Sequence, residues 1–495
     1  MKSLRFKILT ILSLLSLVLS SCGAQDAASK AVVLPMENRP NILFILTDDL
    51  DSRLGTINYM QNLQDLIVSR GTSLQDYFVT SPVCCPSRAT TLRGQYTHNH
   101  GVYNNYAPDG GFEKFNVSKE EESTLAVWLQ SAGYRTALMG KYLNNYPYTD
   151  NREYVPPGWS EWYSPAKKNA YDGYDYVLNE NGTLVTYSPA EKNYFTDVLS
   201  RKAVDFIIRA DQEETPFFLY LVPFAPHEPA TPAFRHATLF PKLAAPRTPS
   251  FNEADVSDKG PGLSGNPLLT DEQILDMDNL YRERVRSLQS VDEMIAELIK
   301  TLDETGQLEN TYIVFTSDNG FHMGQHRLYS GKEYLFEEDI SVPFIIRGPG
   351  IAENKIISGY LTGNVDLAST FTEWAGVQPP AFVDGRSLVD LLQGSPISSE
   401  SWRQVYLLEE YRTGDEKFPT PTYNGLRTLQ YLYVEYSEDF VEFYDLQKDP
   451  YQLENIAPST DPAILKYYSD ALKELNKCSG DTCRKLEAEF SPDPK

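Results

Sequence analysis

Runs of apolar residues that end at polar pairs mark the first three quarters of the chain. Residues 42–46 are apolar without alternation and stop at Thr47-Asp48-Asp49, and residues 312–315 stop at Thr316-Ser317-Asp318-Asn319. An unbroken apolar run of this length predicts a parallel strand that is buried on both faces. The runs 217–222 and 342–346 predict further strands.

Between these runs, apolar residues recur every three or four positions. This spacing predicts an amphipathic helix over 281–305, which ends at Gly306, and shorter helices over 194–210 and 124–131. Strands that alternate with helices are typical of an α/β fold with a doubly wound sheet. Such sheets bind their ligands at the carboxyl ends of the strands, where the polar pairs lie.

Two long stretches interrupt this pattern. Residues 147–187 are crowded with Tyr and Trp, and residues 226–268 are rich in Pro, Ala and Gly. We expect both to be surface excursions, which either shape a substrate cleft or are insertions without a function.

The pattern changes beyond residue 395. Short strands of mixed polarity are predicted over 430–436 and 441–446, and a helix over 463–475. Because 495 residues exceed one ordinary core, we expect a large domain over 39–395 and a smaller C-terminal α+β domain over 396–495.

The N-terminus has the pattern of an export signal. Basic residues precede an apolar run, residues 8–19, that is too short to span a membrane. The run ends in Leu19-Ser20-Ser21-Cys22-Gly23, which resembles a bacterial lipobox. The resemblance implies a signal peptide over 1–21, lipid on Cys22, a tether over 22–38, and export to the bacterial cell envelope, at the periplasm or the cell surface. A plain secretory signal is the alternative.

Composition narrows the class of protein. A hydrophobic fraction of 41% suits a globular enzyme, and the net charge of −24 argues against nucleic acid or an anionic membrane surface as a partner. Cys478 and Cys483 flank a short Ser-Gly-Asp turn. In an exported chain we expect them to form a disulfide, with two free thiols as the alternative.

The polar pairs at the strand ends are candidate metal ligands. Asp48, Asp49, Asp318 and Asn319 offer only oxygen atoms. Such sites suit hard cations, and a site built mostly from protein oxygens favours Ca²⁺ over Mg²⁺. Carboxylates that follow strands also cap helices, which is the alternative for either pair alone.

One motif is long and specific. Cys84-x-Pro86-Ser87-Arg88-x-x-x-Leu92-x-Gly94 resembles the signature of type I sulfatases, in which a maturation enzyme oxidises the first cysteine to Cα-formylglycine. The resemblance implies an alkaline-phosphatase-like fold and a sulfuric ester hydrolase. It extends, in order, over Thr47-Asp48-Asp49, Met139-Gly140-Lys141, Ala225-Pro226-His227, Ser317-Asp318-Asn319-Gly320, Gly331-Lys332, Phe336-Glu337, Tyr444-Asp445-Leu446 and Asp449-Pro450.

The resemblance implies that Cys84 provides the nucleophile. As formylglycine it would be hydrated to a diol, in which one oxygen attacks sulfur and the second hydroxyl later expels the sulfate. It would also be a ligand of the metal, together with Asp48, Asp49, Asp318 and Asn319. We expect Cys84 to be an exposed residue between a strand and a helix, so that its replacement leaves the fold intact.

The resemblance also assigns the positive charges. Lys141, Lys332 and His227 would bind the sulfate oxyanions, and Lys332 or His227 would donate a proton to the leaving alcohol. Arg88 would steady the formylglycine. For any one such residue outside these motifs, a solvated surface charge is the simpler interpretation.

Two positions depart from the family pattern. Many sulfatases carry a histidine two places after the first active-site lysine, where Leu143 stands here, and Arg93 replaces a threonine usual in the signature. The base that regenerates formylglycine is therefore open. Four histidines are candidate replacements, and each is also a candidate structural hydrogen-bonder: His98, His100, His322 and His326.

Further stretches resemble N-acetylglucosamine-6-sulfatases, in which the same histidine is absent. They include Cys85 beside Cys84, Gly94-Gln95-Tyr96-Thr97-His98-Asn99-His100 and Gly140-Lys141-Tyr142-Leu143-Asn144. This resemblance implies hydrolysis of the 6-O-sulfate of N-acetylglucosamine on a glycan. The aromatic rings between Tyr142 and Tyr176 would stack on sugars or pack in the core. The alternatives are a phosphonate monoester hydrolase of the same superfamily and a non-catalytic lipoprotein that binds sulfated glycans.

Overall fold

The structure is a computed structural model that describes residues 39–148, 150–166, 168–411, 422–437 and 439–493. The expected signal peptide over 1–21 and tether over 22–38 lie outside the described residues. Within the described residues, no helix combines the length and the apolar character that a membrane span requires.

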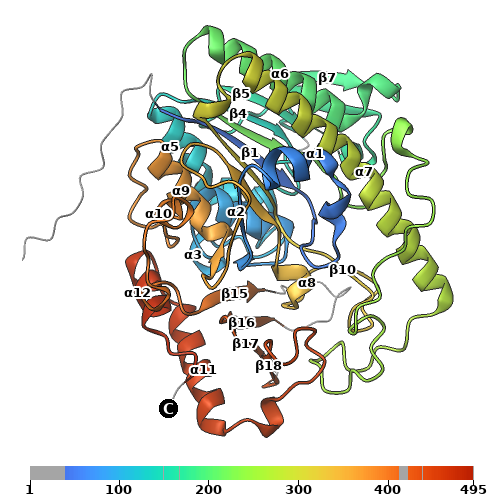
Figure 1. The fold of residues 1–495 in the computed structure, drawn as a ribbon, viewed down its shortest axis with the longest axis vertical. Coiled ribbons are helices and arrows are strands. Elements are labelled where there is room, and N and C mark those ends of the chain that lie inside the picture. The colour runs from blue at the N-terminus through green and yellow to red at the C-terminus, as the bar shows by residue number, and fades with distance from the viewer. Residues whose placement is uncertain (1–38, 149, 167, 412–421, 438, 494–495) are drawn as a thin grey trace, which may run out of the picture. The chain divides into compact units, whose positions relative to one another are not determined.

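A mixed sheet forms the centre of the molecule (Figure 1). Among the described residues its strand order is β13-β2-β12-β9-β1-β8-β4-β5-β6-β7. The strands from β9 to β5 in this order run parallel, and the flanking pairs β9–β12, β12–β2, β5–β6 and β6–β7 are antiparallel. The strand bounds are β1 Asn41–Thr47, β2 Thr72–Leu74, β4 Arg135–Gly140, β5 Glu161–Pro165, β6 Tyr176–Glu180, β7 Thr183–Tyr187, β8 Phe217–Val222, β9 Thr311–Ser317, β12 Phe344–Arg347 and β13 Lys355–Ile357.

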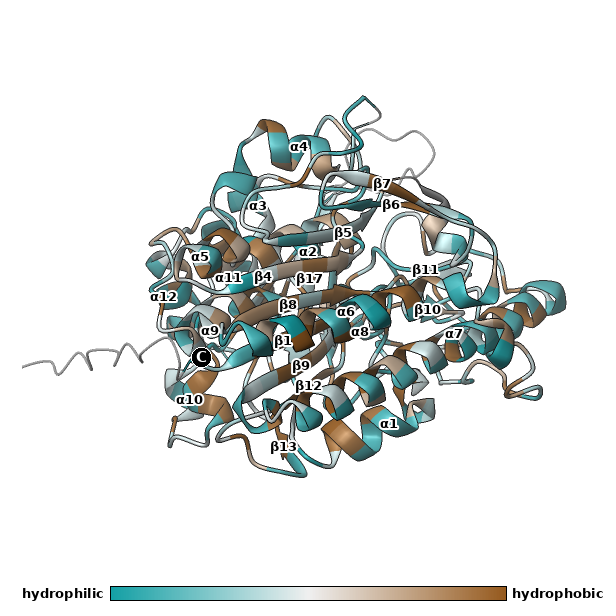
Figure 2. Ribbon diagram, turned by 90° about the horizontal axis from the view of Figure 1, so that it is seen from above, coloured by the Kyte–Doolittle hydropathy of each residue, from teal (hydrophilic) through white to brown (hydrophobic). Residues whose placement is uncertain are grey.

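Helices cover both faces of this sheet. On one face, Ile42, Phe44 and Leu46 of β1 share a buried apolar cluster with α2 (Cys84–Arg93), α5 (Leu125–Ser131) and α9 (Leu367–Trp374). On the other face, Leu43 and Ile45 pack in a second cluster with α6 (Phe195–Gln212) and α7 (Asp271–Glu304). Because successive side chains of a strand point to opposite faces, an unbroken apolar run serves both clusters. Figure 2 shows the hydrophobic colouring of the central strands. The predicted doubly wound α/β fold is confirmed.

Two predicted elements differ from the structure. Helix α7 begins ten residues earlier than expected, at Asp271, because Thr270 and Gln273 form a capping box ahead of the apolar pattern. The aromatic stretch 147–187 is not simply a surface excursion, because it supplies β5, β6 and β7. Trp162 of β5 pairs in register with Leu138 of β4 and is fully buried.

The C-terminal part contains a separate antiparallel sheet. Its strands are β15 (Tyr406–Glu410), β16 (Tyr423–Arg427), β17 (Tyr431–Tyr436) and β18 (Val441–Asp445), and they are followed by α11 (Pro462–Leu475) and α12 (Asp481–Glu489). The predicted strand pair and helix are confirmed. The boundary at residue 395 stays a prediction.

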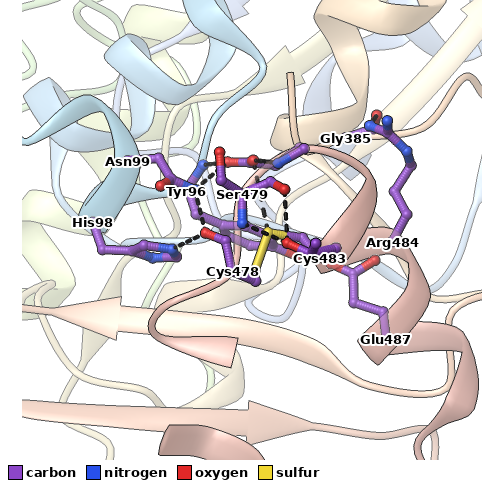
Figure 3. Close-up of a disulfide and its surroundings, with 12 residues drawn as sticks. Tyr96, His98, Asn99, Gly385, Cys478, Ser479, Cys483, Arg484 and Glu487 are labelled. Atoms are coloured by element: carbon purple, nitrogen blue, oxygen red, sulfur yellow. Dashed lines mark hydrogen bonds between the residues drawn. A yellow bond between two sulfur atoms is a disulfide. The ribbon is translucent and has the colours of Figure 1, made fainter. Parts of the chain in front are cut away.

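The expected disulfide between Cys478 and Cys483 is present (Figure 3). It closes a loop next to α3 (Thr97–His100), where the carbonyl oxygen of Cys478 lies 2.9 Å from His98 Nε2 and accepts a 2.9 Å hydrogen bond from Asn99 Nδ2. The remaining short elements are α1 Gln61–Leu63, β3 Tyr77–Phe78, α4 Gly111–Val117, β10 His322–Met323, β11 Ser330–Gly331, α8 Glu337–Ile340, β14 Thr362–Gly363 and α10 Val389–Leu392.

Candidate active site

The carboxyl ends of neighbouring parallel strands bring the predicted site together. Asn41 to Thr47 of β1 pairs residue by residue with Thr311 to Ser317 of β9. Asp48 and Asp318 therefore follow the two strands at the same edge of the sheet. Lys141 follows β4 and His227 lies beyond the end of β8, which are the next strands along this edge.

The two polar pairs form a buried cluster. The backbone N–H of Asp49 donates a 3.1 Å hydrogen bond to Asp318 Oδ1, and Asn319 Nδ2 donates one of 2.8 Å to Asp49 Oδ1. Asp49 has a φ of 66°, in the left-handed region, which turns the chain sharply after β1. All four side chains are nearly inaccessible to solvent.

Cys84 is the first residue of α2 and points toward these carboxylates. Its Sγ atom lies 3.6 Å from Asp48 Oδ1, 4.0 Å from Asp49 Oδ1 and 2.7 Å from Lys332 Nζ. The expectation that Cys84 is exposed is wrong, because all ten residues of α2 are buried and Cys84 is 1% exposed. Gly94 ends this helix with a φ of 66°, and a Cβ atom there would lie 2.8 Å from Val383 Cγ1.

The Cys84 thiol is a poor nucleophile in this setting. Burial raises the pKa of the thiol to about 12, although Lys141 and Lys332 act in the opposite direction. Because the thiolate is the reactive form, an unmodified Cys84 is almost entirely protonated and unreactive at neutral pH.

The predicted cations each contact a carboxylate of the cluster. Lys141 Nζ lies 2.6 Å from Asp48 Oδ2, Lys332 Nζ pairs with Asp49, and Arg88 Nε donates a 2.8 Å hydrogen bond to Asp318 Oδ2. Burial raises the pKa of Asp48, but Lys141, His227 and Arg88 outweigh it, so that this pKa is lowered overall. The three carboxylates thus face three fixed positive charges in a buried site.

The site offers a group of candidate metal ligands in which a thiol and an imidazole join two carboxylates. One ligand atom from each of Asp48, Asp49, Cys84 and His227 lies within 4.8 Å of the others. Asn319 Oδ1 is a buried acceptor without a hydrogen-bond partner among the described residues, and it extends from the residue next to Asp318. An unsatisfied buried carbonyl beside several carboxylates is the arrangement in which Ca²⁺ replaces a missing hydrogen-bond donor.

A cavity of about 900 Å³ opens above Cys84. Its wall contains Lys141, Lys332 and His227, so that the predicted sulfate-binding residues and the predicted nucleophile face one space. The aromatic rings divide into two groups. Tyr142, Tyr146 and Trp162 pack edge to face on one another, whereas the Tyr171 ring lies 4.8 Å from the His227 ring. The cavity is also lined by Asn105, Tyr106, Glu113, Tyr142, Leu143, Asn144, Asn145, Tyr146, Pro147, Tyr148, Arg152, Ser164, Pro165, Ala166, Tyr171, Phe224, Glu228 and Glu333.

The four candidate replacement histidines are not part of this wall. In the described structure His98 lies 2.8 Å from Glu409 Oε1, and His100 Nε2 lies 3.1 Å from Thr90 Oγ1. His322 and His326 contact Asp339 and Glu253 through Nδ1, at 2.9 and 2.7 Å. Leu143 does line the cavity. His227 is the histidine of the described wall.

One buried residue that supports the site was not predicted. Arg284 of α7 donates hydrogen bonds to the backbone oxygens of Asp49 and of Pro226, the latter over 3.2 Å, and is fully buried. It therefore holds together the turn at Asp49, a candidate metal ligand, and the turn that precedes His227. A signal was available, since Arg284 occupies the apolar face of the predicted helix between Tyr281 and Leu288.

The fold, together with the polar residues gathered at the carboxyl ends of its strands, indicates a class of hydrolases. The model of the Sulfatase family matches residues 40–377, and that of the N-sulphoglucosamine sulphohydrolase C-terminal region matches residues 324–478. Human N-acetylglucosamine-6-sulfatase is 36% identical over 507 residues, which cover 95% of this chain and 90% of that protein. The chain belongs to the sulfatase family and is a sulfuric ester hydrolase with an alkaline-phosphatase-like fold.

Solved structures share this fold. BT4656 in complex with its substrate D-glucosamine-2-N,6-O-disulfate matches with a TM-score of 0.76 and 24% identity, over 92% of this chain and 100% of that chain. The phosphonate monoester hydrolase of Agrobacterium radiobacter matches with a TM-score of 0.67 and 21% identity, over 88% and 95% of the two chains. At these identities the likeness concerns the fold, which by itself does not separate sulfate from phosphonate esters.

Proposed function

We propose that this protein hydrolyses the 6-O-sulfate ester of N-acetylglucosamine on glycans, with Cys84 converted to formylglycine and Ca²⁺ at the carboxylate cluster. The observation that carries the proposal is that Cys84 lines one cavity with Lys141, Lys332 and His227 and also lies beside Asp48 and Asp49. The 36% identity with human N-acetylglucosamine-6-sulfatase over most of both chains supports the substrate.

The metal would be held by Asp48, Asp49, Asp318, Asn319 and the converted Cys84. When bound, Ca²⁺ supplies positive charge that polarises the sulfuryl group. The converted Cys84 supplies the hydrated aldehyde that acts as nucleophile. Neither Ca²⁺ nor the hydrated aldehyde is suited to recognise the sulfate oxygens alone. Side chains of the protein therefore bind these oxygens.

Lys141, Lys332 and His227 bind the sulfate group. The two lysines are cations held in place in the site, and they stabilise the charge that develops on the sulfate oxygens without reorganising, which lowers the barrier. Lys332 Nζ lies 2.7 Å from Cys84 Sγ, at the position where the ester approaches the nucleophile. Lys332 or His227 is therefore in place to donate the proton to the leaving alcohol. Arg88 fixes Asp318 and, through a 3.0 Å bond to the Lys141 carbonyl oxygen, the start of the Lys141 loop.

The test is turnover of defined substrates by protein from its native host. We expect sulfate release from N-acetylglucosamine 6-sulfate, together with a mass of the Cys84 peptide that corresponds to formylglycine. A phosphonate monoester hydrolase is the second candidate, because that class shares the fold. Hydrolysis of a phosphonate monoester at a rate at least equal to that of the sulfate ester would support it in place of the first.

We further propose that the chain is exported and anchored by lipid on Cys22 to the bacterial cell envelope. The support is the order of basic residues, the short apolar run and Leu19-Ser20-Ser21-Cys22. Fractionation of cells tests it. Wild type should sediment with membranes and Cys22→Ala should not, and an equal distribution of the two would contradict the anchor.

A further inference from the structure

Arg152 lines the same cavity as Cys84 but takes no part in the cluster around it. Its side chain is partly buried. Within the residues that the structure describes, its guanidinium makes no hydrogen bond and no ion pair. A guanidinium keeps its charge at any ordinary pH and carries five N–H donors, so a partly buried one is normally paired. Among the described residues, Arg152 is therefore a cation of the cavity wall that no protein group pairs.

This separates Arg152 from the other cations of the wall. Lys141 and Lys332 each contact an aspartate of the cluster at hydrogen-bonding distance. The carboxylates of the wall are Glu113, Glu228 and Glu333. Since like charges repel, an anionic group of a ligand would avoid these glutamates and settle at Arg152.

The backbone on either side of Arg152 is fixed. The N–H of Tyr154 donates to the carbonyl oxygen of Asn151 over 3.3 Å, which closes a turn around Arg152. The carbonyl oxygen of Tyr154 accepts a 2.8 Å hydrogen bond from Asn179 Nδ2. The hydroxyl group of Tyr154 donates a 3.0 Å hydrogen bond to Glu121 Oε2. These contacts hold the backbone that carries Arg152, so that its side chain starts from a fixed place on the cavity wall.

The cavity is larger than the reacting group requires. Its volume of about 900 Å³ is near the upper end of the roughly 300–1,000 Å³ that pockets for drug-sized ligands occupy. The scissile sulfate meets Lys141, Lys332 and His227, which leaves room for the sugar and for a further group.

We infer that Arg152 binds a second oxyanion of the substrate, in addition to the sulfate that is removed, and so makes the enzyme selective for multiply charged glycans. The group is a sulfate or a carboxylate, carried either by the same glucosamine or by the next sugar. Both present paired oxygens that match the guanidinium fork. The inference rests on the proposed function.

The test compares three substrates with one another in each variant. N-acetylglucosamine 6-sulfate has one oxyanion, glucosamine 2-N,6-O-disulfate carries a second on the same sugar, and a disaccharide of N-acetylglucosamine 6-sulfate with a uronate carries it on the neighbour. The ratio of kcat/KM values between a doubly and a singly charged substrate is measured for wild type, Arg152→Ala and Arg152→Lys. This ratio is independent of how much of each preparation is folded.

We expect wild type to prefer at least one doubly charged substrate, and Arg152→Ala to lower that preference about 10- to 100-fold, chiefly through KM. Arg152→Lys should keep part of it. The matched control is Arg70→Ala, which removes an exposed arginine that pairs with Glu353 at the surface, and should leave the ratio unchanged. The doubly charged substrate whose kcat/KM falls more in Arg152→Ala shows whether the second oxyanion lies on the same glucosamine or on the neighbouring sugar.

A wild type without such a preference, or an Arg152→Ala variant with the wild-type ratio, would overturn the inference while the proposed function stands. Failure of wild type to release sulfate from any of the three substrates would overturn the proposed function itself, and the inference with it.

Discussion

Cys84 is buried, and its Sγ atom lies 2.7 Å from Lys332 Nζ. We expect Cys84→Ala to lower kcat by at least about 10³-fold, because the loss of a covalent nucleophile removes the reaction path itself. Removal of one buried sulfur should cost only about 1 kcal/mol of folding stability. Sulfate release and the thermal unfolding midpoint, measured on the same preparation, check both parts.

Cys85 offers a matched control at the adjacent position. It is equally buried but does not border the cavity among the described residues, and its backbone N–H donates to Asn105. Cys85→Ala should destabilise the fold by a similar amount and keep turnover. Comparable activity in Cys84→Ala and wild type would mean that the reaction does not pass through position 84.

The unsatisfied Asn319 Oδ1 predicts a dependence on added metal. Treatment with a chelator should abolish turnover, and Ca²⁺ should restore it better than Mg²⁺ or Zn²⁺, because the ligands are oxygens in a flexible arrangement. Asn319→Leu should raise the Ca²⁺ concentration needed for half-maximal recovery by about tenfold or more. Binding of Ca²⁺ followed by calorimetry gives a readout apart from activity. Full recovery with Zn²⁺ alone would contradict the oxygen-ligand argument.

At the scale of single residues, the site could be predicted from sequence motifs, whereas the burial of its residues could not. Asp48 and Asp318 could be predicted to lie at the same edge of the sheet, because each follows an apolar run that predicts a strand. They lie close together because the two strands are neighbours in the sheet. The burial of Cys84 could not be foreseen, because α2 is buried on all sides and so shows no amphipathic period. Arg284 differs, because its place on the apolar face of the predicted helix indicates burial, but the sequence does not show which groups it contacts.

The short helix α3 joins the main part of the molecule to the disulfide loop through His98. Burial lowers the pKa of His98, but the contact with Glu409 outweighs it and raises the pKa to about 9. A pKa raised in the folded state contributes stability that is complete below about pH 6.5 and disappears as the pH rises through about 9. This contribution should be up to about 3 kcal/mol.

We therefore expect His98→Gln to be most destabilised, relative to wild type, near pH 6, and the difference in unfolding free energy to shrink toward pH 9.5. Denaturant titrations across this range measure it. Because His98 lies outside the described cavity wall, kcat should be retained. A folded His98→Gln variant with a kcat reduced more than tenfold would instead make His98 the base that regenerates formylglycine.

At the scale of elements, the predictable part of the fold was the part with a clear period. The helices over 194–210 and 124–131 and the strands β1, β8 and β9 follow from spacing alone. The strands β5 to β7 lack a regular alternation of polarity in their sequence. Their conformation is decided by pairing along the sheet, since β5 pairs with β4, β6 with β5 and β7 with β6. The described residues of the 226–268 stretch, by contrast, contain no long helix or strand, as expected of an excursion.

The N-terminal part of the described chain and the C-terminal sheet share one apolar cluster. Phe78 and Tyr96 from the main part pack in it with Leu426 and Tyr433 of the C-terminal sheet. Buried charges also cross between the parts, since Arg403 lies 2.7 Å from Asp366 Oδ2 and 2.7 Å from Glu487 Oε2. A boundary read from a change of sequence pattern at residue 395 does not reveal such shared contacts.

Residues 39–395 alone should therefore not form a stable domain. Without Arg403 the buried carboxylate of Asp366 loses its ionic partner and keeps only hydrogen bonds from the backbone N–H groups of Gly363 and Arg386. Removal of one partner of a buried ion pair costs about 3–5 kcal/mol. The exposed cluster around Phe78 adds to this, against a total stability of about 5–15 kcal/mol for a typical domain. Expression of this fragment should give unfolded or aggregated material, whereas the full chain should unfold in one calorimetric transition. A soluble fragment with its own cooperative transition, together with two transitions in the full chain, would show that residues 396–495 are an independent domain and that the shared cluster contributes little to either part.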